Sequence, residues 1–410
     1  MNVSVNKCYM KILYIHQYFV TPEEPGGTRS YWFSKELVKR GHQVVMITST
    51  NSYHPSPCRI NIDGIDVIYV KNEYSNYFSP LRKVKSFLNF MRLSIKMASK
   101  EKNVDIVYAT STPLTVGGIA LWLYYIKGWR YIFEVRDLWP EFPIQIGAIK
   151  NPILIKILRR FEKWIYKKSE YVVALSPGMQ DGVLSAGTPS DKVCVIPNMS
   201  KPDKFYPHEP SLEIVKRYNL NLNKFNIIHF GSMGKANGLG YLIETAKLLK
   251  EQGIHDVNFI FLGDGATLPI LKDLVDKYYL DNVKFLGNHK MDVVSEVVNC
   301  CDASITSFLD LPILYTNSPN KLFDSLSAGK PIIVNSSGWT KDLVEKEDCG
   351  CYVDPKDPQS FVNKILEIKD DKDLLDRWGK NARSLSLSTF NKSLLSCRMA
   401  NVVEQYGKKG

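Results

Sequence analysis

The sequence has 410 residues, of which 44% are hydrophobic and 23% are charged. This composition is typical of a globular protein, and the length is enough for two domains of about 200 residues, each with its own core. No run of about 18 uncharged apolar residues occurs, so no transmembrane helix is predicted, and residues 1–9 lack the apolar region of a signal peptide. The eight cysteines show neither Cys-x-x-Cys nor Cys/His zinc spacing, and we interpret them as reduced thiols of a cytosolic protein.

The net charge of +11 is placed unevenly along the chain. Residues 1–203 contain 27 Lys and Arg against 16 Asp and Glu, whereas residues 204–410 contain 26 of each kind. A charge of one sign on one half of the chain predicts an anionic surface or partner for that half.

The first half is predicted to be a doubly wound α/β domain. Residues 10–16 form a short apolar run that is typical of a buried parallel strand, and a loop rich in proline and glycine follows it. A helix at about 28–40 and a strand at 42–48 complete the opening of such a fold, in which ligands bind beyond the carboxyl ends of the strands. Further strands are expected at 65–70, 106–110, 131–135, 171–175 and 193–196, with helices at about 80–100, 114–126, 151–168 and 178–185.

A second α/β series follows a predicted linker at residues 199–222, which contain three prolines. Its strands are expected at 226–230, 257–262, 283–286 and 303–307, with helices at about 238–251, between 265 and 283, at about 292–300 and 318–328, and a terminal helix past about 385. We therefore divide the chain into a first domain over residues 10–200 and a second domain over residues 201–385. The C-terminal helix, about 386–410, is a candidate to pack back on the first domain.

The helix after residue 318 has signals at both ends. Ser318 suits the N-cap, Pro319 suits the first helical position, and Gly329 is placed to end the helix in a left-handed turn. Its buried face is predicted to consist of Leu322, Phe323 and Leu326. Lys321 in the first turn opposes the helix dipole. It is either an exposed lysine or part of a site in which the helix N-terminus binds an anion.

Four loops of the second half follow predicted strands or open this helix: Gly231–Ala236, Gly263–Gly265, Gly287–His289 and Asn317–Lys321. The carboxyl ends of parallel strands converge on one crevice, and glycine lets backbone N–H groups approach a phosphate. Each loop alone is a weak signal. Together with the lysine-bearing helix they favour a nucleotide-diphosphate site.

Several motifs resemble those of family 4 glycosyltransferases: Pro197-Asn198, the loop after Phe230, Leu262-Gly263-Asp264-Gly265, Phe285-Leu286-Gly287 and the segment from Asp324 to Gly329-Lys330-Pro331. The resemblance covers nearly the whole chain. It is closest to the bacterial branch that builds O-antigen and capsule repeat units, including N-acetyl-L-fucosamine transferases, through Gly26-Gly27-Thr28-Arg29, Glu134–Glu141 and Ser318–Asp324.

This resemblance implies the GT-B fold, in which two Rossmann-like parallel-sheet domains face a central crevice. It also implies a retaining transfer of a sugar, such as N-acetyl-L-fucosamine, from a UDP-sugar donor to a polyprenyl-diphosphate-linked sugar acceptor. Members of this fold generally need no metal, no Asp-x-Asp metal motif appears in a strand-end loop, and no cofactor is expected. The diphosphate would then be neutralised by lysine, arginine and a helix dipole.

The resemblance further implies donor-binding residues: Gly231, Ser232, Lys235, Gly263, Gly287, Asn288, Thr316, Asn317, Ser318, Asn320, Lys321 and Asp324. The family has two glutamates eight positions apart, where this chain has Thr316 and Asp324. Asp324 would accept hydrogen bonds from the ribose, whereas Thr316 cannot supply a carboxylate to the sugar. We assign the cationic role toward the diphosphate to Lys235 and Lys321, with a solvated loop lysine as the alternative for Lys235.

The predicted catalytic residues are Asp137, Glu134, Arg136 and Lys235. Asp137 and Glu134 are candidates to hold the donor sugar or the acceptor. Arg136 stands where many relatives have histidine; it cannot be a base, since its pKa is above about 12, and it is alternatively an ion-pair partner of Asp137. The predicted acceptor-binding residues are His16, Gly26, Gly27 and Arg29, and a hydrogen-bonded histidine near the core is the alternative for His16.

Two predicted helices of the first half, at about 80–100 and 151–168, mix cationic with apolar and aromatic residues. They suit an anionic bilayer surface, or else are ordinary amphipathic helices with a solvated basic face. No nucleic-acid module accompanies them, so nucleic acid is not expected as a partner. The predicted location is cytoplasmic, peripheral on the inner face of the cell membrane. The competing functions are a sugar-nucleotide 2-epimerase of similar fold and a non-catalytic membrane scaffold.

Overall fold

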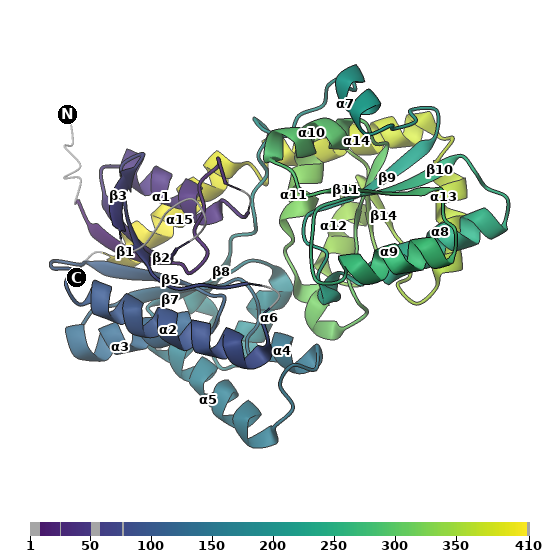
Figure 1. Ribbon diagram of the computed structural model, residues 1–410. Helices are drawn as coiled ribbons and strands as arrows, with labels where there is room; N and C mark the ends of the chain where they lie inside the picture. The colour runs from purple at the N-terminus through teal and green to yellow at the C-terminus, as the bar shows by residue number, and fades with distance from the viewer. Residues whose placement is uncertain (1–8, 25, 51–57, 76–77, 408–410) are drawn as a thin grey trace, which may run out of the picture. The chain divides into compact units, whose positions relative to one another are not determined.

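A computed structural model describes residues 9–24, 26–50, 58–75 and 78–407. It divides into two compact units, one made of the chain up to Pro197 together with the segment from Ser393, and the other made of Asn198–Lys392. Each unit has a largely parallel β-sheet covered by helices on both faces (Figure 1). The predicted α/β class with two doubly wound domains is therefore confirmed.

The first unit is built on an eight-stranded sheet with the order β3-β4-β2-β1-β5-β6-β7-β8. The strands are β1 Lys11–Ile15, β2 Gln43–Ser49, β3 Cys58–Ile62, β4 Ile65–Val70, β5 Ile106–Thr110, β6 Tyr131–Val135, β7 Tyr171–Ala174 and β8 Val193–Val195. The helices are α1 Arg29–Lys39, α2 Pro80–Ala98, α3 Thr115–Lys127, α4 Glu141–Gln145, α5 Pro152–Lys168, α6 Pro177–Ser185 and α15 Lys392–Gly407, with a short 3-10 turn, η1, at Ser190–Lys192. Helices α2, α3 and α5 cover one face, and α1 and α15 cover the other (Figure 1). The central strands are largely apolar because both of their faces are buried.

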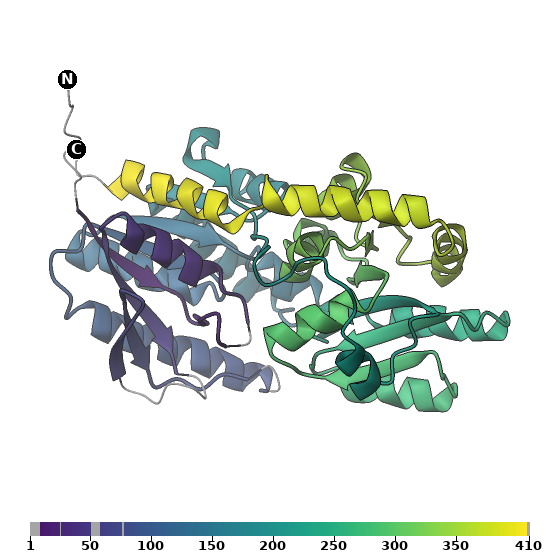
Figure 2. The same cartoon turned by 90° about the horizontal axis from the view of Figure 1, so that it is seen from above.

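Helix α15 completes the first unit from the far end of the chain. Its Glu404 pairs with Arg40 at 2.9 Å and with His42 Nε2 at 3.0 Å. The ring of Tyr406 stacks on Tyr171, with 4.3 Å between the ring centroids. Figure 2 shows this helix, in yellow, beside α1, in purple.

Strand β3 is an element that was not predicted from the sequence. It pairs antiparallel with β4 at the edge of the sheet. Asp63 and Gly64 connect the two strands with φ angles of 51° and 87°. Two consecutive residues with positive φ form the tight hairpin turn for which Asp-Gly is favoured.

The second unit is built on a six-stranded parallel sheet with the order β11-β10-β9-β12-β13-β14. The strands are β9 Phe225–Phe230, β10 Val257–Leu262, β11 Val283–Gly287, β12 Ala303–Thr306, β13 Ile332–Val334 and β14 Gly350–Tyr352. The helices are α7 Leu212–Arg217, α8 Gly240–Glu251, α9 Leu268–Lys277, α10 Met291–Asn299, α11 Asn320–Ser327, α12 Trp339–Lys346, α13 Pro358–Ile368 and α14 Lys372–Leu387, with 3-10 turns η2 Lys235–Asn237 and η3 Pro312–Thr316. Strands β13 and β14 and helices α7, α12, α13 and α14 were not predicted.

The prediction of a linker at residues 199–222 is wrong. This segment contains α7 and packs against the second unit, where Phe205 is 1% exposed. Ser200 Oγ donates to the carbonyl oxygen of Phe323 at 3.0 Å, and Lys201 N donates to Ser327 Oγ at 3.0 Å. These hydrogen bonds anchor the segment along α11. Its prolines interrupt regular structure, but they do not prevent burial.

Helix α11 has the predicted C-terminus but not the predicted N-cap. Gly329 has φ 62°, which confirms the left-handed turn, and the predicted buried face is fully buried. The helix begins at Asn320 after Pro319, with no side-chain cap. Ser318 instead accepts a hydrogen bond at its Oγ from the backbone N–H of Asn198, at 3.3 Å. A side chain occupied by another segment is not available to cap the helix.

Candidate active site

The carboxyl edge of the second sheet brings together three of the predicted donor-binding glycines. In the observed strand order, the winding reverses between β9 and β12, which is where ligands bind in doubly wound sheets. Gly231 N donates to Leu262 O at 2.8 Å, and Gly263 N donates to Gly287 O at 2.7 Å. A Cβ atom on Gly263 would lie 1.9 Å from the carbonyl oxygen of Gly231, so this close approach requires glycine.

Lys321 extends from the first turn of α11 toward this edge. Its Nζ lies 3.2 Å from His229 Nε2, at the end of β9, and 3.1 Å from Asn237 Oδ1 in the β9–α8 loop. His229 is fully buried, and burial with the nearby Lys321 lowers its pKa well below the ordinary value. Neutral His229 therefore accepts the hydrogen bond, and desolvation lowers the pKa of Lys321 to about 7.

Lys321 has no carboxylate partner within salt-bridge distance among the described residues. Its neighbours His229 and Asn237 contribute polarity but no negative charge. Lys321 is thus a half-buried lysine at the switch point of the sheet whose charge is not neutralised by a carboxylate of the described residues, which makes it a candidate to bind an anion.

Lys235 does not share a pocket with Lys321. It is exposed on η2 and lines a pocket whose walls come from the start of α8, from α9 and from the loops around Asp310 and Lys356. Neither Lys321 nor Asp324 lines that pocket. The structure thus does not support the predicted diphosphate clamp of two lysines. The other predicted loop residues, Ser232 and Asn288, are exposed.

Asp324 forms an ion pair that was not predicted. Its Oδ1 lies 3.0 Å from Lys201 Nζ, and both side chains are at most 10% exposed. Burial raises the pKa of Asp324, and the nearby Lys201 ammonium opposes that rise. Asp324 is therefore held in one orientation by a partner from the segment that had been predicted to be a linker.

The residues that precede α11 are largely held by backbone contacts. The Thr316 hydroxyl donates to a carbonyl oxygen three residues earlier at 2.7 Å, and the carbonyl oxygen of Asn317 accepts from Trp339 Nε1 at 2.5 Å. Ser318 is 8% exposed, while Asn320 at the start of the helix is half-buried. Of these predicted donor-binding residues, Asn320 is the one next to Lys321 with an accessible side chain.

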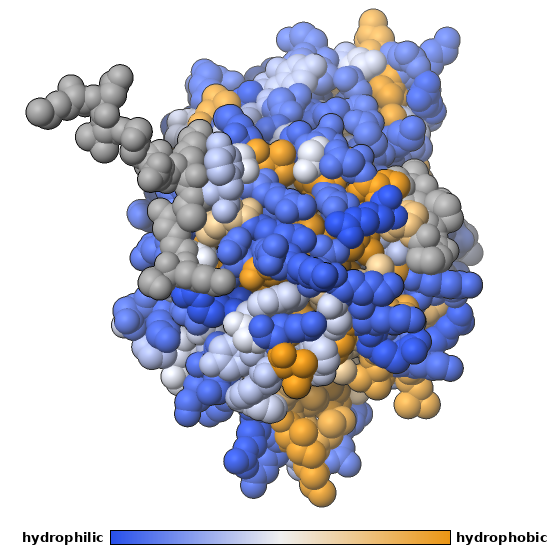
Figure 3. Space-filling model, turned by 90° about the vertical axis from the view of Figure 1, so that its left-hand side faces the viewer, coloured by the Kyte–Doolittle hydropathy of each residue, from blue (hydrophilic) through white to orange (hydrophobic). Residues whose placement is uncertain are grey.

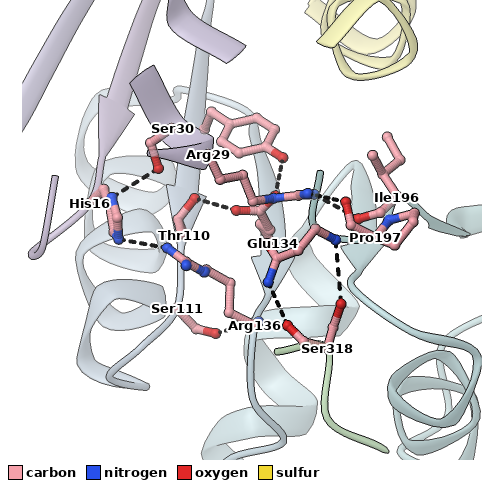
Figure 4. Close-up of polar contacts among 12 residues, drawn as sticks. His16, Arg29, Ser30, Thr110, Ser111, Glu134, Arg136, Ile196, Pro197 and Ser318 are labelled. Atoms are coloured by element: carbon pink, nitrogen blue, oxygen red, sulfur yellow. Dashed lines mark hydrogen bonds and ion pairs between the residues drawn. The ribbon is translucent and has the colours of Figure 1, made fainter. Parts of the chain in front are cut away.

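Arg29 lies at the centre of a buried network in the first unit (Figure 4). Its Nε donates to Glu134 Oε1 at 2.9 Å, and both side chains are at most 1% exposed. Its two terminal nitrogens donate to the carbonyl oxygens of Ile196 and Pro197, the former at 2.7 Å. All three nitrogens of the guanidinium are thus used within the unit.

Glu134 is equally occupied. Its Oε1 accepts from Tyr108 at 3.0 Å, and its Oε2 accepts from Thr110 at 3.0 Å. The structure gives Glu134 and Arg29 buried partners in place of the predicted roles in catalysis and acceptor binding. Both groups are buried and hydrogen-bonded to each other and to the chain around them, which favours a structural role.

His16 and Arg136 form a second contact at the carboxyl edge of the first sheet (Figure 4). Arg136 Nη1 lies 2.9 Å from His16 Nε2, and His16 Nδ1 lies 2.8 Å from Ser30 Oγ. Burial and the charge of Arg136 lower the pKa of His16 well below its ordinary value. The neutral ring must accept at Nε2, so Nδ1 carries the proton and donates to Ser30. His16 thus matches the alternative of a hydrogen-bonded histidine near the core.

Arg136 is not the ion-pair partner of Asp137. The Asp137 carboxylate accepts from Thr112 Oγ1 at 2.8 Å, and burial raises the pKa of Asp137. Both Arg136 and Asp137 are half-buried at the end of β6 and remain candidates for substrate contact. Gly26 is exposed and Gly27 is half-buried in the loop before α1.

Three residues of this description were not predicted: His229, Asn237 and Lys201. A polar residue near the end of an apolar strand was a local signal for His229. Lys201 pairs with a residue more than 120 positions away, so no local pattern could identify it. In the described part of the chain, no three His, Cys, Asp or Glu side chains are grouped closely enough to hold a metal ion.

Each unit corresponds to a known glycosyltransferase domain. Residues 26–199 match the glycosyl transferase 4-like domain, and residues 211–385 match the glycosyl transferases group 1 model. The protein is a glycosyltransferase of the GT-B fold. The chain is similar to WbjE, a probable glycosyltransferase of Pseudomonas aeruginosa. The two are 22% identical over 286 residues, which covers 67% of this chain and 68% of the relative.

Other relatives share shorter segments. The UDP-Gal:alpha-D-GlcNAc-diphosphoundecaprenol alpha-1,3-galactosyltransferase of Escherichia coli is 28% identical over 206 residues, which is 49% of this chain and 51% of that protein. The fold is similar to that of sucrose-phosphate synthase from Thermosynechococcus elongatus, with a TM-score of 0.77, 18% identity and coverage of 97% and 98% of the two chains. It is also similar to Anabaena Alr3699/HepE in complex with UDP and glucose, with a TM-score of 0.71, 18% identity and coverage of 97% and 100%.

Proposed function

We propose that this glycosyltransferase takes its sugar from a UDP-sugar and that Lys321 binds the diphosphate of the donor. The observation that carries this proposal is the Lys321 ammonium, held at the switch point of the second sheet by His229 and Asn237 with no carboxylate from the described residues beside it. Anabaena Alr3699/HepE, which has a similar fold, has been solved with UDP and with UDP-glucose. A diphosphate would replace the missing counter-ion of Lys321.

The proposed acceptor is a sugar linked to a polyprenyl diphosphate. Its support is the resemblance to the O-antigen and capsule branch and the acceptor in the name of the E. coli relative.

In the proposed retaining reaction, the acceptor hydroxyl attacks the anomeric carbon on the face from which UDP leaves. The bond to UDP breaks, and the leaving phosphate accepts the proton of the hydroxyl. The proposed sugar is an N-acetylated deoxyhexosamine such as N-acetyl-L-fucosamine, for surface polysaccharide.

Product analysis tests the proposed reaction. The purified protein is incubated with a series of UDP-sugars and a polyprenyl-diphosphate-linked sugar, and the products are separated by mass and by linkage. The donor is found first by its thermal stabilisation of the protein, because a ligand that binds only the folded state raises the melting temperature. Transfer to the lipid-linked sugar is expected, whereas inversion at C2 of the free UDP-sugar or no reaction would contradict the proposal.

Asp324 is proposed to accept hydrogen bonds from the ribose, and replacing it tests this role. Asp324→Asn is expected to raise the dissociation constant of UDP about tenfold or more, because the charged acceptor is lost. The measurement is a calorimetric titration with UDP.

The ion pair with Lys201 requires a control for the fold. In the double variant Lys201→Met/Asp324→Leu, neither charge is left unpaired, so the stability should be closer to that of the wild type than in Asp324→Leu alone. UDP binding should stay weak in the double variant. Recovery of UDP affinity together with stability would show that Asp324 has only a structural role.

The first unit is proposed to contact an anionic membrane surface through α5. Ile153 and Ile157 are 70% and 58% exposed, and Trp164 is 46% exposed. Around them the exposed basic side chains are Lys156, Arg159, Arg160, Lys163 and Lys167. Figure 3 shows apolar side chains in orange at the lower end of this unit, where α3 and α5 lie in Figure 1. Exposed apolar and basic residues on one helix suit the bilayer interface.

No helix in the described residues is long and apolar enough to cross a bilayer. Attachment at the surface would therefore come from α5, and we expect Ile153→Ser/Ile157→Ser to weaken binding to phosphatidylglycerol vesicles severalfold in a sedimentation assay, since about 0.8 kcal/mol is lost per buried CH₂ group. The exposed apolar residues of the second unit offer a matched control, Ile270→Ser/Leu366→Ser. Equal losses in both double variants would argue against a role of α5.

A further inference from the structure

A basic pocket of the first unit lies between the end of β4 and the N-terminal half of α2. Its volume is about 450 Å³, which is within the range of small-molecule sites. Three cations line it: Lys71, Arg82 and Lys85. The acidic residue in its wall is Glu73, whose carboxylate is 3.8 Å from Arg82 with both side chains largely exposed. The described lining therefore has an excess of two positive charges.

The polar floor of the pocket is preorganised by hydrogen bonds. Asn72 is 2% exposed, and its Nδ2 donates to Ser86 Oγ at 3.2 Å. Ser86 Oγ donates to the carbonyl oxygen of Glu73 at 2.7 Å, and Asn89 Nδ2 donates to Asn72 Oδ1 at 3.1 Å. These contacts hold the chain after β4 against α2, so the floor of the pocket has a fixed geometry in the folded unit.

A row of aromatic rings leads from this pocket to the carboxyl end of β1. Phe78 lines the pocket, and its ring centroid is 6.4 Å from that of Tyr74. The ring centroids of Tyr74 and Tyr18 are 5.1 Å apart, and those of Tyr18 and His16 are 6.4 Å apart. Phe87 stacks on Tyr74 at 5.7 Å. Phe78, Tyr74, Tyr18 and Phe87, which we call the aromatic row, are all partly exposed.

Helix α2 carries an exposed apolar stripe next to the same pocket. Leu81 is 84% exposed, Val84 is 52% exposed and Leu88 is 50% exposed. Their spacing of three and four residues puts them on one side of the helix. The pocket residues Arg82, Lys85 and Asn89 have the same spacing one position later, so the cationic and apolar stripes run side by side.

We propose that this pocket binds the diphosphate of the polyprenyl-diphosphate-linked acceptor. The excess of two positive charges equals the charge of a diphosphate that is esterified at both ends. The sugar, at one end of the diphosphate, lies over the aromatic row toward His16 and the carboxyl end of β1. The isoprenoid, at the other end, lies along the apolar stripe of α2. This inference rests on the proposed function, because it names the subsite for the proposed acceptor.

The test uses farnesyl-diphosphate-N-acetylglucosamine as a water-soluble probe, with the full chain. Arg82→Ala/Lys85→Ala removes two cations of the pocket, and Arg92→Ala/Lys96→Ala removes two exposed cations from the same helix outside it. The dissociation constant of the probe is expected to rise about tenfold or more in the first double variant, because two charged hydrogen-bond donors are lost, and less than about twofold in the second. Inorganic pyrophosphate should compete with the probe.

The aromatic row is tested separately. Tyr74→Ala should weaken binding of farnesyl-diphosphate-N-acetylglucosamine severalfold and leave the affinity for inorganic pyrophosphate unchanged. Thermal melting of each variant shows whether the unit is still folded. Equal losses in the two double variants, or a lack of competition by pyrophosphate, would overturn the proposal.

Two further measurements distinguish an acceptor subsite from a site for a lipid headgroup and from a failure of donor binding. If Arg82→Ala/Lys85→Ala weakens binding to phosphatidylglycerol vesicles but not to the soluble probe, the pocket binds a lipid headgroup and the proposal fails. UDP binding belongs to the second unit and should be the same in all of these variants. Failure of the wild-type protein to bind UDP or the probe would contradict the proposed donor or acceptor, whereas binding of the probe that is unchanged in Arg82→Ala/Lys85→Ala would contradict this inference alone.

Discussion

Lys321→Met is expected to raise the dissociation constant of UDP by about two orders of magnitude, because it removes a desolvated ammonium for which the described residues supply no counter-ion. Calorimetric titration with UDP measures this loss. Lys235→Met is the comparison, since Lys235 is exposed and lines a pocket that does not include Lys321. A small effect is expected there. If both substitutions weakened UDP binding equally, the clamp of two lysines predicted from the sequence would be correct after all.

The same lysine predicts how UDP binding depends on pH. Its pKa is lowered to about 7 by desolvation, so the ligand-free protein loses the charge as the pH rises above that value. Binding must then take up a proton, and the affinity should fall by nearly tenfold for each pH unit above about 7. Titrations in two buffers with different ionisation enthalpies measure the proton uptake. Lys321→Arg stays charged over this range, and a similar decline in that variant would assign the pH dependence to another group.

The pKa of Lys321 also has a consequence for stability. Its ordinary value in an unfolded chain is 10.5, so between about pH 7 and 10.5 the unfolded state binds more protons than the folded state. The contribution of Lys321 to the free energy of unfolding therefore rises with pH across this window, by up to about 1.4 kcal/mol per pH unit. The gain should be absent in Lys321→Met.

Arg29→Met is expected to reduce the free energy of unfolding by about 3–5 kcal/mol, because it leaves the Glu134 carboxylate buried without its partner. Urea denaturation measures the loss. The exposed pair of Arg159 and Glu141 in the same unit is a matched control, and Arg159→Met should cost less than about 1 kcal/mol.

A double variant distinguishes structure from substrate binding in this network. Arg29→Met/Glu134→Leu leaves neither charge unpaired, so part of the lost stability should return. A stable Arg29→Met variant with a raised KM for the acceptor would instead restore the binding role predicted from the sequence.

Most of the parallel strands and the glycine loops of both units could be predicted because their signals are local. An apolar run is sufficient for a buried strand, and Gly329 alone marks the end of α11. Strand β3 also has a local signal, because the Asp63-Gly64 pair between two strands favours a tight hairpin turn. The segment at residues 199–222 was misread because its prolines resemble those of a linker.

The roles of individual polar residues were harder to predict. Arg29 follows a glycine-rich loop, as a binding residue often does. However, it forms a buried ion pair with Glu134, which is more than 100 residues away in the sequence. The role of Lys201 was hard to predict for the same reason, because its partner Asp324 is distant in the sequence. Whether a charged side chain faces a substrate or a buried partner depends on pairings across the fold, which one sequence does not contain.

The position of α15 has a consequence for synthesis on the ribosome. This helix buries Leu395, Met399 and Val403 in the first unit, although the whole second unit precedes it in the chain. Residues up to Pro197 therefore leave the ribosome without the helix that covers one face of their sheet. The second unit has all of its strands before α15 emerges, so the domain that is translated first is the one that is completed last.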